Sequence, residues 1–368
     1  EQSVLWGKGG QGCRLRVQIP GAPVETLRQQ AFVGLSRSVH QTATHHGVGR
    51  RMPQSPNRQL RGAEHTFAVC GRGRLHAAKV LQMNGNEAHK RFVEAAQAGG
   101  HDEREARAIW QAWLQDRWGL TRTQWMLHEH EPVSDVFAGQ WELDAQQFRI
   151  GIPYQYTLGW VNFAGVRLDL GPGVLIPRPE TEAWVLDWSK RLPHAKRALD
   201  VCSGSGCIAV GLAQAWPKAT VYAVEWDADA WPWLIKNAAQ FPDVHPVNAD
   251  ALAPPPFALT SLDLLLSNPP YIPEGERETL ANHVRDYEPG VALFVPQTDP
   301  LLFYRSLVEW GERLLRPGGW WSVECHTDFT IDVAQLVSRP GWSVPEIRAD
   351  IFGKPRFVEA QWLGIFTP

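Results

Sequence analysis

Four consecutive residues, Asn268-Pro269-Pro270-Tyr271, are the part of the chain best suited to chemistry. They follow the apolar run Leu262–Ser267, which predicts a buried strand that ends at a polar residue and two prolines. The Asn side-chain carbonyl and a proline main-chain carbonyl can both accept hydrogen bonds from one planar NH2 group, and the tyrosine ring offers it a flat surface. The motif predicts a cradle for an amide or an exocyclic amine, although Asn and Pro also form ordinary turns.

A second candidate site is the segment Asp200–Gly206, between a predicted strand and a predicted helix. Gly204 and Gly206 allow the backbone to come close to a ligand, because neither carries a Cβ atom. Glu225 ends the next predicted strand, where a carboxylate can grip two ribose hydroxyls. Asp250, after the third strand, could contact an adenine amine, although an aspartate in an exposed loop is the more common outcome.

This pocket alone leaves two kinds of enzyme open. The spacing from Gly204 to Ala209 is a loose match to the dinucleotide fingerprint, so an NAD-type dehydrogenase remains an alternative to an enzyme that binds a methyl donor. No histidine stands near the fourth strand to serve as an acid or base. The cradle favours methyl transfer, because accepting both N–H bonds of an amide pulls its lone pair out of conjugation; orientation and carbonyl dipoles then carry the catalysis.

The elements that must position these residues alternate between strand and helix patterns. This alternation predicts a doubly wound, mainly parallel, seven-stranded α/β sheet of the Rossmann-like class. We expect strands at Arg197–Cys202, Thr220–Glu225, Val244–Val247, Leu262–Ser267, Trp320–Glu324 and Phe357–Trp362, and helices at Ser205–Ala215, Ala228–Gln240, Pro300–Leu315 and Ile331–Ser338.

The region before this sheet has two other patterns. Apolar residues at helical spacing from Asn84 to about Ala138 predict a small helical domain, in which Gly99-Gly100 separates two helices and Thr121 or Thr123 caps a third. Alternation from Tyr154 to Leu175 then predicts a β-hairpin. We expect a helical substrate-recognition domain over 83–150, a hairpin and connector over 151–182, and the catalytic domain over 183–368.

Charge separates the first 82 residues from the rest. They carry 12 Lys and Arg against 3 Glu, whereas the remaining chain carries 24 basic and 36 acidic residues. Lacking apolar periodicity, residues 1–82 are expected to form a disordered basic leader. An organellar transit peptide and a nucleic-acid-binding tail are alternatives, but we favour upstream sequence outside the natural protein, with Met83 as the start. The five cysteines form no C-x-x-C pair, which argues against a zinc site, and no apolar run is long enough to span a membrane.

With these motifs placed, the chain resembles the release-factor glutamine methyltransferases, the PrmC/HemK type of class I methyltransferase. The resemblance covers roughly Asn84 to Trp362 and is most specific in the connector Val174–Glu182. It implies S-adenosyl-L-methionine as the cofactor and the Gly-Gly-Gln loop of peptide chain release factors as the substrate, in the cytoplasm. Two further blocks, Val284–Leu293 and Phe303–Arg305, also look like the family.

The resemblance also implies roles for individual residues. Asn268–Tyr271 would hold the substrate glutamine and carry the catalysis, with Arg178 and Glu180 of the connector also facing the substrate. The cofactor would contact Asp200, Cys202, Ser203, Gly204, Ser205, Gly206, Glu225, Asp250, Ala251 and Asn268.

The chain departs from the family at three places. Cys202 stands where the family usually has glycine, Ala251 where some members carry an aromatic residue, and Phe294–Gln297 where glycines are common. Adenine-amine DNA methyltransferases use a very similar cradle on a flipped base. They need a basic surface for phosphates, however, and residues 83–368 carry a net charge of −12. A non-enzymatic adaptor is the remaining alternative, although the complete set of site residues argues against it.

Overall fold

The computed structural model describes residues 83–256 and 261–364, so the expectations for residues 1–82 lie outside the described residues. A bundle of helices comes first. Its caps follow local sequence: the side chain of Asn84 accepts a hydrogen bond from the first turn of α1, and Asp102 with Glu105 forms a capping box at α2. Thr121 caps α3, which confirms one of the two expected caps. The helices are α1 (Gly85–Ala98), α2 (Glu103–Trp118), α3 (Arg122–His128), α4 (Asp135–Arg149) and α5 (Tyr154–Leu158).

Aromatic packing holds this bundle together. Phe92, Trp110, Trp113 and Phe148 are almost completely buried, and ring contacts connect all four. The helical region extends beyond the expected end near Ala138, because α4 and α5 continue to Leu158.

The expected β-hairpin follows the bundle. Strands β1 (Trp160–Phe163) and β2 (Val166–Asp169) pair antiparallel across a two-residue turn. Both turn residues, Ala164 and Gly165, have positive φ, which is the geometry of the tight turns that match strand twist. The connector then leads into α6 (Pro179–Arg191), which carries a proline in its first turn.

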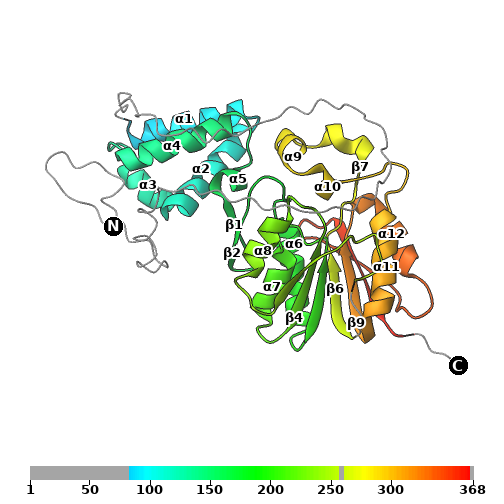
Figure 1. Cartoon of the computed structure of the whole chain (residues 1–368). Helices are drawn as coiled ribbons and strands as arrows, with labels where there is room; N and C mark the ends of the chain where they lie inside the picture. The colour runs from blue at the N-terminus through cyan, green and yellow to red at the C-terminus, as the bar shows by residue number, and fades with distance from the viewer. Residues whose placement is uncertain (1–82, 257–260, 365–368) are drawn as a thin grey trace, which may run out of the picture. The chain divides into compact units, whose positions relative to one another are not determined.

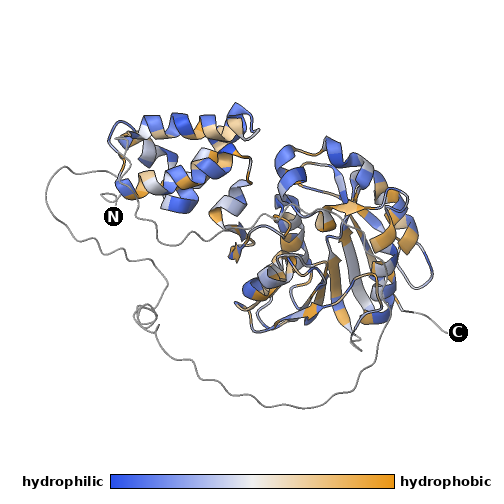
Figure 2. Cartoon of the chain, turned by 45° about the horizontal axis from the view of Figure 1, so that its top comes forward, coloured by the Kyte–Doolittle hydropathy of each residue, from blue (hydrophilic) through white to orange (hydrophobic). Residues whose placement is uncertain are grey.

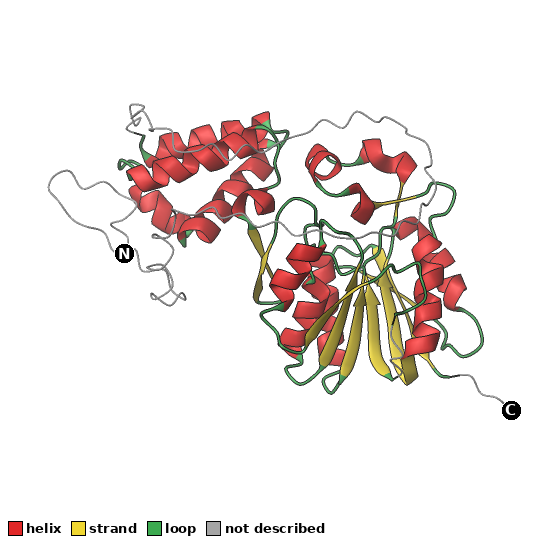
Figure 3. Cartoon of the chain, viewed as in Figure 1, coloured by secondary structure: helices red, strands yellow, loops and turns green. Residues whose placement is uncertain are grey.

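A seven-stranded sheet is the centre of the remaining described chain and confirms the expected fold class (Figure 1, Figure 3). Its order is β10-β11-β9-β6-β3-β4-β5, and β11 runs in the opposite direction to the other six strands. The strands are β3 (Arg197–Val201), β4 (Thr220–Glu225), β5 (Val244–Asn248), β6 (Leu262–Ser267), β9 (Leu315–Glu324), β10 (Glu346–Ala349) and β11 (Pro355–Trp362).

Helices cover both faces of this sheet and create two separate cores. One core packs α6, α7 (Cys207–Ala215) and α8 (Trp231–Ala238) against one face, and the other packs α11 (Leu302–Leu314) and α12 (Thr330–Val337) against the opposite face. Figure 2 shows the hydrophobic residues concentrated on the strands between these layers. Burial on both faces explains why the central strands are almost continuously apolar rather than alternating.

A small accessory unit follows β6 and was not expected. It contains β7 (Ile272–Pro273), which pairs in parallel with β8 (Phe294–Val295), together with the short helices η2 (Glu274–Thr279), α9 (Asn282–Tyr287) and α10 (Gly290–Leu293). Gln297 accepts a hydrogen bond from the backbone N–H of Gly275. The segment Phe294–Gln297 therefore braces the chain just after the Asn-Pro-Pro-Tyr motif.

Candidate active site

Two loops meet where the strand order reverses, at the carboxyl ends of β3 and β6. These strands are neighbours, with Val201 opposite Ser267, so Cys202 and Asn268 leave the sheet side by side. In open α/β sheets this reversal point is the usual place for a ligand. The two motifs expected to do chemistry are thus brought together by the topology of the sheet.

A cavity with about 760 Å³ of atom-free space, including its open mouth, lies between these loops. Its wall includes the connector, the loop after β3, the end of β4 and the motif after β6, together with residues of α7, α10 and α11 and the turn before α8. The residues that line it include Arg178, Thr181, Cys202, Ser203, Gly204, Ser205, Glu225, Trp226, Asn268 and Pro270.

The loop after β3 is a tight left-handed turn. Cys202, Gly204 and Gly206 all have positive φ, at 60°, 53° and 80°. A Cβ on Gly206 would lie 2.7 Å from the side chain of Leu234, so both the backbone and the space require glycine there. Cys202 adopts this conformation although a positive φ favours glycine. Desolvation in this loop raises the pKa of the Cys202 thiol well above its usual value.

Asp200 lies beneath this loop and does not line the cavity. Its side chain is fully buried, and one carboxyl oxygen accepts a hydrogen bond from the backbone N–H of Ala209 at 3.1 Å. Burial raises the pKa of Asp200 to about 8. Its position supports the turn rather than a direct contact with a ligand, and its assignment to cofactor binding stays a prediction.

We expect the free energy of unfolding of the donor-free protein to fall as the pH rises between about 4 and about 8. The folded state keeps a proton on Asp200 that the unfolded state, with its ordinary pKa of 3.8, has already released. Each pH unit in this window then favours the unfolded state by up to about 1.4 kcal/mol. Urea unfolding at about pH 5.5 and about pH 7.5 should show a smaller loss for Asp200→Asn than for the original chain. Equal losses in both proteins would assign the titration to other groups.

Glu225 occupies the wall of the cavity with its carboxylate held by three backbone donors. Oε2 accepts a hydrogen bond from the N–H of Gly204 at 2.8 Å, and Oε1 accepts from the N–H groups of Trp226 and Asp227, each at 2.8 Å. Burial raises the pKa of Glu225, while these hydrogen bonds act in the opposite direction. A carboxylate has about four acceptor positions, so this arrangement fixes its direction and leaves capacity for a ligand hydroxyl.

Trp226 is a wall residue that was not predicted from the sequence. It follows Glu225 directly and is 56% exposed, an unusual state for a tryptophan that lies against a cavity. Its position immediately after the acidic residue at the end of β4 is the signal that could have identified it. A flat, exposed ring beside the Glu225 carboxylate is suited to stacking against a planar ligand.

The structure places Asp250 and Ala251 away from the cavity wall. Asp250 is exposed, and its carboxylate accepts a hydrogen bond from the N–H of Leu252. Ala251 is buried in the core, and its carbonyl accepts a hydrogen bond from the hydroxyl of Ser306. Asp250 has the contact of an aspartate in an exposed loop, and the assignment of Asp250 and Ala251 to cofactor binding stays a prediction.

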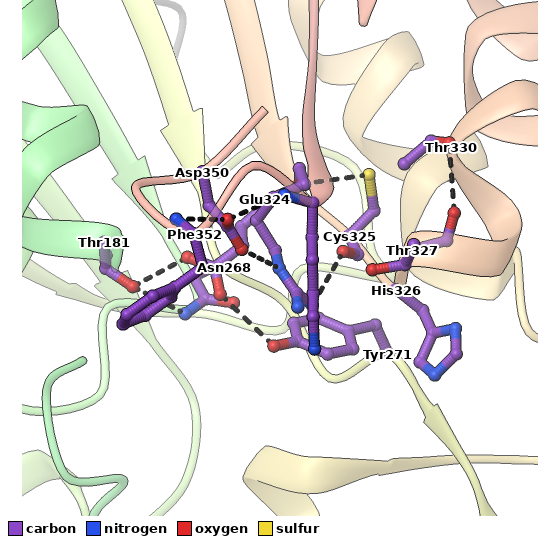
Figure 4. A network of polar contacts seen from close by, with 12 residues as sticks. Thr181, Asn268, Tyr271, Glu324, Cys325, His326, Thr327, Thr330, Asp350 and Phe352 are labelled. Carbon is purple, nitrogen blue, oxygen red and sulfur yellow. Dashed lines mark hydrogen bonds and ion pairs between the residues drawn. The ribbon is translucent and has the colours of Figure 1, made fainter. Parts of the chain in front are cut away.

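The Asn-Pro-Pro-Tyr motif is held by a polar network that reaches into α6 and β9 (Figure 4). The Nδ2 of Asn268 donates to the hydroxyl of Thr181 at 3.4 Å, and the hydroxyl of Tyr271 donates to Glu324 at 3.2 Å. Pro269 and Pro270 are buried, and Pro270 lines the cavity. Thr181 and Glu324 were not singled out from the sequence, although Glu324 ends its strand at the same sheet edge as Glu225.

A second cavity, with about 710 Å³ of atom-free space, shares part of its wall with the first. Asn268 and Arg178 line both cavities, and Tyr271 lines the second. Arg178 donates to Glu288 at 2.7 Å, which holds its side chain in place. Glu180, expected with Arg178 at the substrate, lines neither cavity. The rest of the second wall is mainly aliphatic, from Leu175, Ile272, Leu280, Val284, Ala292 and Leu293.

Two other kinds of site find no support. Among residues 83–256 and 261–364, no group of three or more His, Cys, Asp or Glu side chains is placed to hold a metal ion. Within the same residues, no helix is both long and apolar enough to cross a membrane.

Comparisons with known proteins agree with this arrangement. Residues 87–159 match the PrmC N-terminal domain and residues 162–284 match the Methyltransferase small domain. A release factor glutamine methyltransferase of Bacteroides thetaiotaomicron is 38% identical over 60% of this chain and 81% of its own length. One from Flavobacterium psychrophilum is 30% identical over 74% of this chain and 96% of its own.

Among solved structures, a methyltransferase from Pyrococcus furiosus covers 55% of this chain and 90% of its own, at 18% identity and a TM-score of 0.41. At that score the likeness adds nothing to the sheet topology described above. The identity and the coverage of the curated relatives carry the assignment. The chain belongs to the release factor glutamine methyltransferase family.

Proposed function

We propose that this protein transfers a methyl group from S-adenosyl-L-methionine to the side-chain amide nitrogen (N5) of a glutamine, the one in the Gly-Gly-Gln motif of peptide chain release factors. The observation that carries the proposal is the position of Asn268 on the walls of both cavities. A methyl donor in the first cavity and an amide in the second would meet at this residue.

The first cavity fits the donor in its chemistry. The carboxylate of Glu225 suits the ribose hydroxyls, the exposed ring of Trp226 suits the adenine, and the turn Cys202–Gly206 gives close backbone access to the methionine end. When bound, S-adenosyl-L-methionine supplies an electrophilic methyl group on a positively charged sulfur.

The second cavity fits a glutamine side chain. Its aliphatic wall can bury the methylene stem, while the polar groups of the motif lie at the end shared with the first cavity. The carbonyl of Asn268 and a main-chain carbonyl of Pro269 or Pro270 would accept the two amide N–H groups, with the ring of Tyr271 beside the amide plane. Arg178 would line the passage between the two cavities.

The chain's residues then need only to orient the amide. Accepting both N–H bonds aims the nitrogen lone pair at the shared wall and favours the positive charge that develops on nitrogen during attack. The proton becomes acidic only as the new bond forms, so no base with a shifted pKa is needed beforehand.

The test is methyl transfer from labelled S-adenosyl-L-methionine to purified release factor. Release factors with Gly-Gly-Gln and with Gly-Gly-Ala are compared, with duplex DNA in parallel. We expect label on the Gly-Gly-Gln protein alone. Label on DNA would instead favour adenine-amine methylation, and the absence of label everywhere would contradict the proposal.

A further inference from the structure

The proposed chemistry makes no use of a buried carboxylate at the end of β9. Glu324 is 2% exposed, and it accepts hydrogen bonds from two hydroxyl groups of distant parts of the chain. The Thr181 hydroxyl on α6 donates to Oε2 at 2.7 Å, and the Tyr271 hydroxyl donates to Oε1 at 3.2 Å (Figure 4). One oxygen of this carboxylate therefore binds Thr181, which contacts Asn268 of the Asn-Pro-Pro-Tyr motif. The other oxygen binds Tyr271, the last residue of that motif.

The hydrogen bond from Thr181 to Glu324 determines which end of the Asn268 amide can bind Thr181. A hydroxyl has a single proton, and that of Thr181 is directed to Glu324. Toward Asn268 the Thr181 oxygen consequently presents only lone pairs, which can pair with the amide NH2 but not with the amide oxygen. The contact from Asn268 Nδ2 to Thr181 Oγ1, at 3.4 Å, has this polarity.

This polarity matters because the two ends of an asparagine amide have almost the same shape. Their assignment follows from their partners. If Thr181 donated to Asn268 instead, the amide would turn and present its NH2 to the cavity, where it could not accept a hydrogen bond. With Thr181 as acceptor, the Asn268 carbonyl is left for the glutamine amide.

We propose that Glu324 is a positioning residue: through Thr181 it sets the direction of the Asn268 amide, and through the Tyr271 hydroxyl it fixes the ring beside it. Its role in methyl transfer rests on the function proposed above, whereas the direction of the amide does not. The side chain must accept two hydrogen bonds, one on each oxygen, and an ionised carboxylate does so without a donor proton of its own to compete.

The surroundings of Glu324 contain a compensating charge. Burial raises its pKa, while the hydrogen bond from Thr181 and the positive charge of Arg356 act in the opposite direction. Arg356 is itself anchored, because Nη1 donates to the carbonyl of Cys325 at 3.3 Å and Nε lies 3.4 Å from the carboxylate of Asp350. Arg356 thus offsets only part of the cost of burying the Glu324 carboxylate, because it is also paired with Asp350.

The test uses Thr181→Val, which keeps the side-chain shape and removes the hydroxyl, with Thr181→Ser as the matched control. Both are made in the original chain and in Asn268→Ala. We expect Thr181→Val to lower kcat about tenfold with donor affinity nearly unchanged, and Thr181→Ser to retain most of the activity. In the Asn268→Ala background, Thr181→Val should cost nothing further, because the group that it orients is gone. An equal loss in both backgrounds would indicate a purely structural role and overturn the proposal.

A second readout does not depend on activity. In protein labelled with ¹⁵N-asparagine, the side-chain NH2 signal of Asn268 is assigned by its loss in Asn268→Ala. Thr181→Val and Glu324→Gln should both shift this signal and speed its hydrogen exchange, whereas Thr181→Ser should leave it in place. An unshifted signal in both variants would overturn the proposal. If release factor received no methyl group but the signal responded as expected, the proposed function would fail and the orientation of Asn268 by Glu324 would stand.

Discussion

Replacing Asn268 with alanine is expected to lower kcat for methyl transfer at least about a hundredfold, the usual scale for the loss of a positioned dipole. The residue lines both cavities, and its carbonyl is the side-chain acceptor proposed for the substrate amide. The affinity for S-adenosyl-L-methionine should change no more than a few-fold, because Glu225 and the turn after β3 remain intact. Single-turnover rates and calorimetric titration of the donor measure the two quantities separately.

Asn162→Ala provides a matched control for this substitution. Asn162 is an exposed residue on β1, away from either cavity wall, so both kcat and donor affinity should stay unchanged. An Asn268→Ala protein with the turnover of the original chain would contradict the cradle assignment. A similar loss in both variants would point to a general defect.

Four of the parallel strands could be predicted from sequence, because each is a short run of strand-forming residues bounded by clear turn signals. β4 and β6 have the expected bounds, and β3 and β5 differ by a single residue. In contrast, β10 was missed, because an exposed Glu-Ile-Arg-Ala strand at the sheet edge lacks an apolar face. β9 begins five residues earlier than expected, since Pro317 and Gly318 within it resemble a turn.

The two loops of the site could also be predicted, because each is a continuous segment at the end of a recognisable strand. The side chains that position Asn268, namely Thr181 and through it Glu324, could not be predicted. Thr181 and Glu324 are separated by 143 residues, and their contact exists only because α6 packs beside the ends of β6 and β9. The same reason applies to Phe294–Gln297, whose role in bracing the chain after Tyr271 depends on the pairing of β7 with β8.

Glu225→Ala is expected to weaken donor binding at least about a hundredfold. The change removes the carboxylate proposed to grip the ribose, where hydrogen bonds to a charged group contribute about 1.5–3 kcal/mol each. It also leaves the backbone N–H groups of Gly204, Trp226 and Asp227 without their acceptor, so the turn after β3 loses its anchor. Calorimetric titration with S-adenosyl-L-methionine measures the loss, and thermal unfolding in its absence shows whether the fold persists.

Glu182→Ala separates this effect from the general loss of a carboxylate that accepts a backbone N–H. Glu182 accepts a hydrogen bond from the N–H of Ala164 at 2.8 Å and does not line either cavity, so donor affinity should remain that of the original chain. Glu225→Gln should fall between the two, because its amide keeps one acceptor oxygen for the backbone but carries no charge for the ribose. If Glu225→Ala bound the donor as tightly as Glu182→Ala, the first cavity would not be the donor site. The position of Asn268 on the walls of both cavities would then no longer support the proposed reaction.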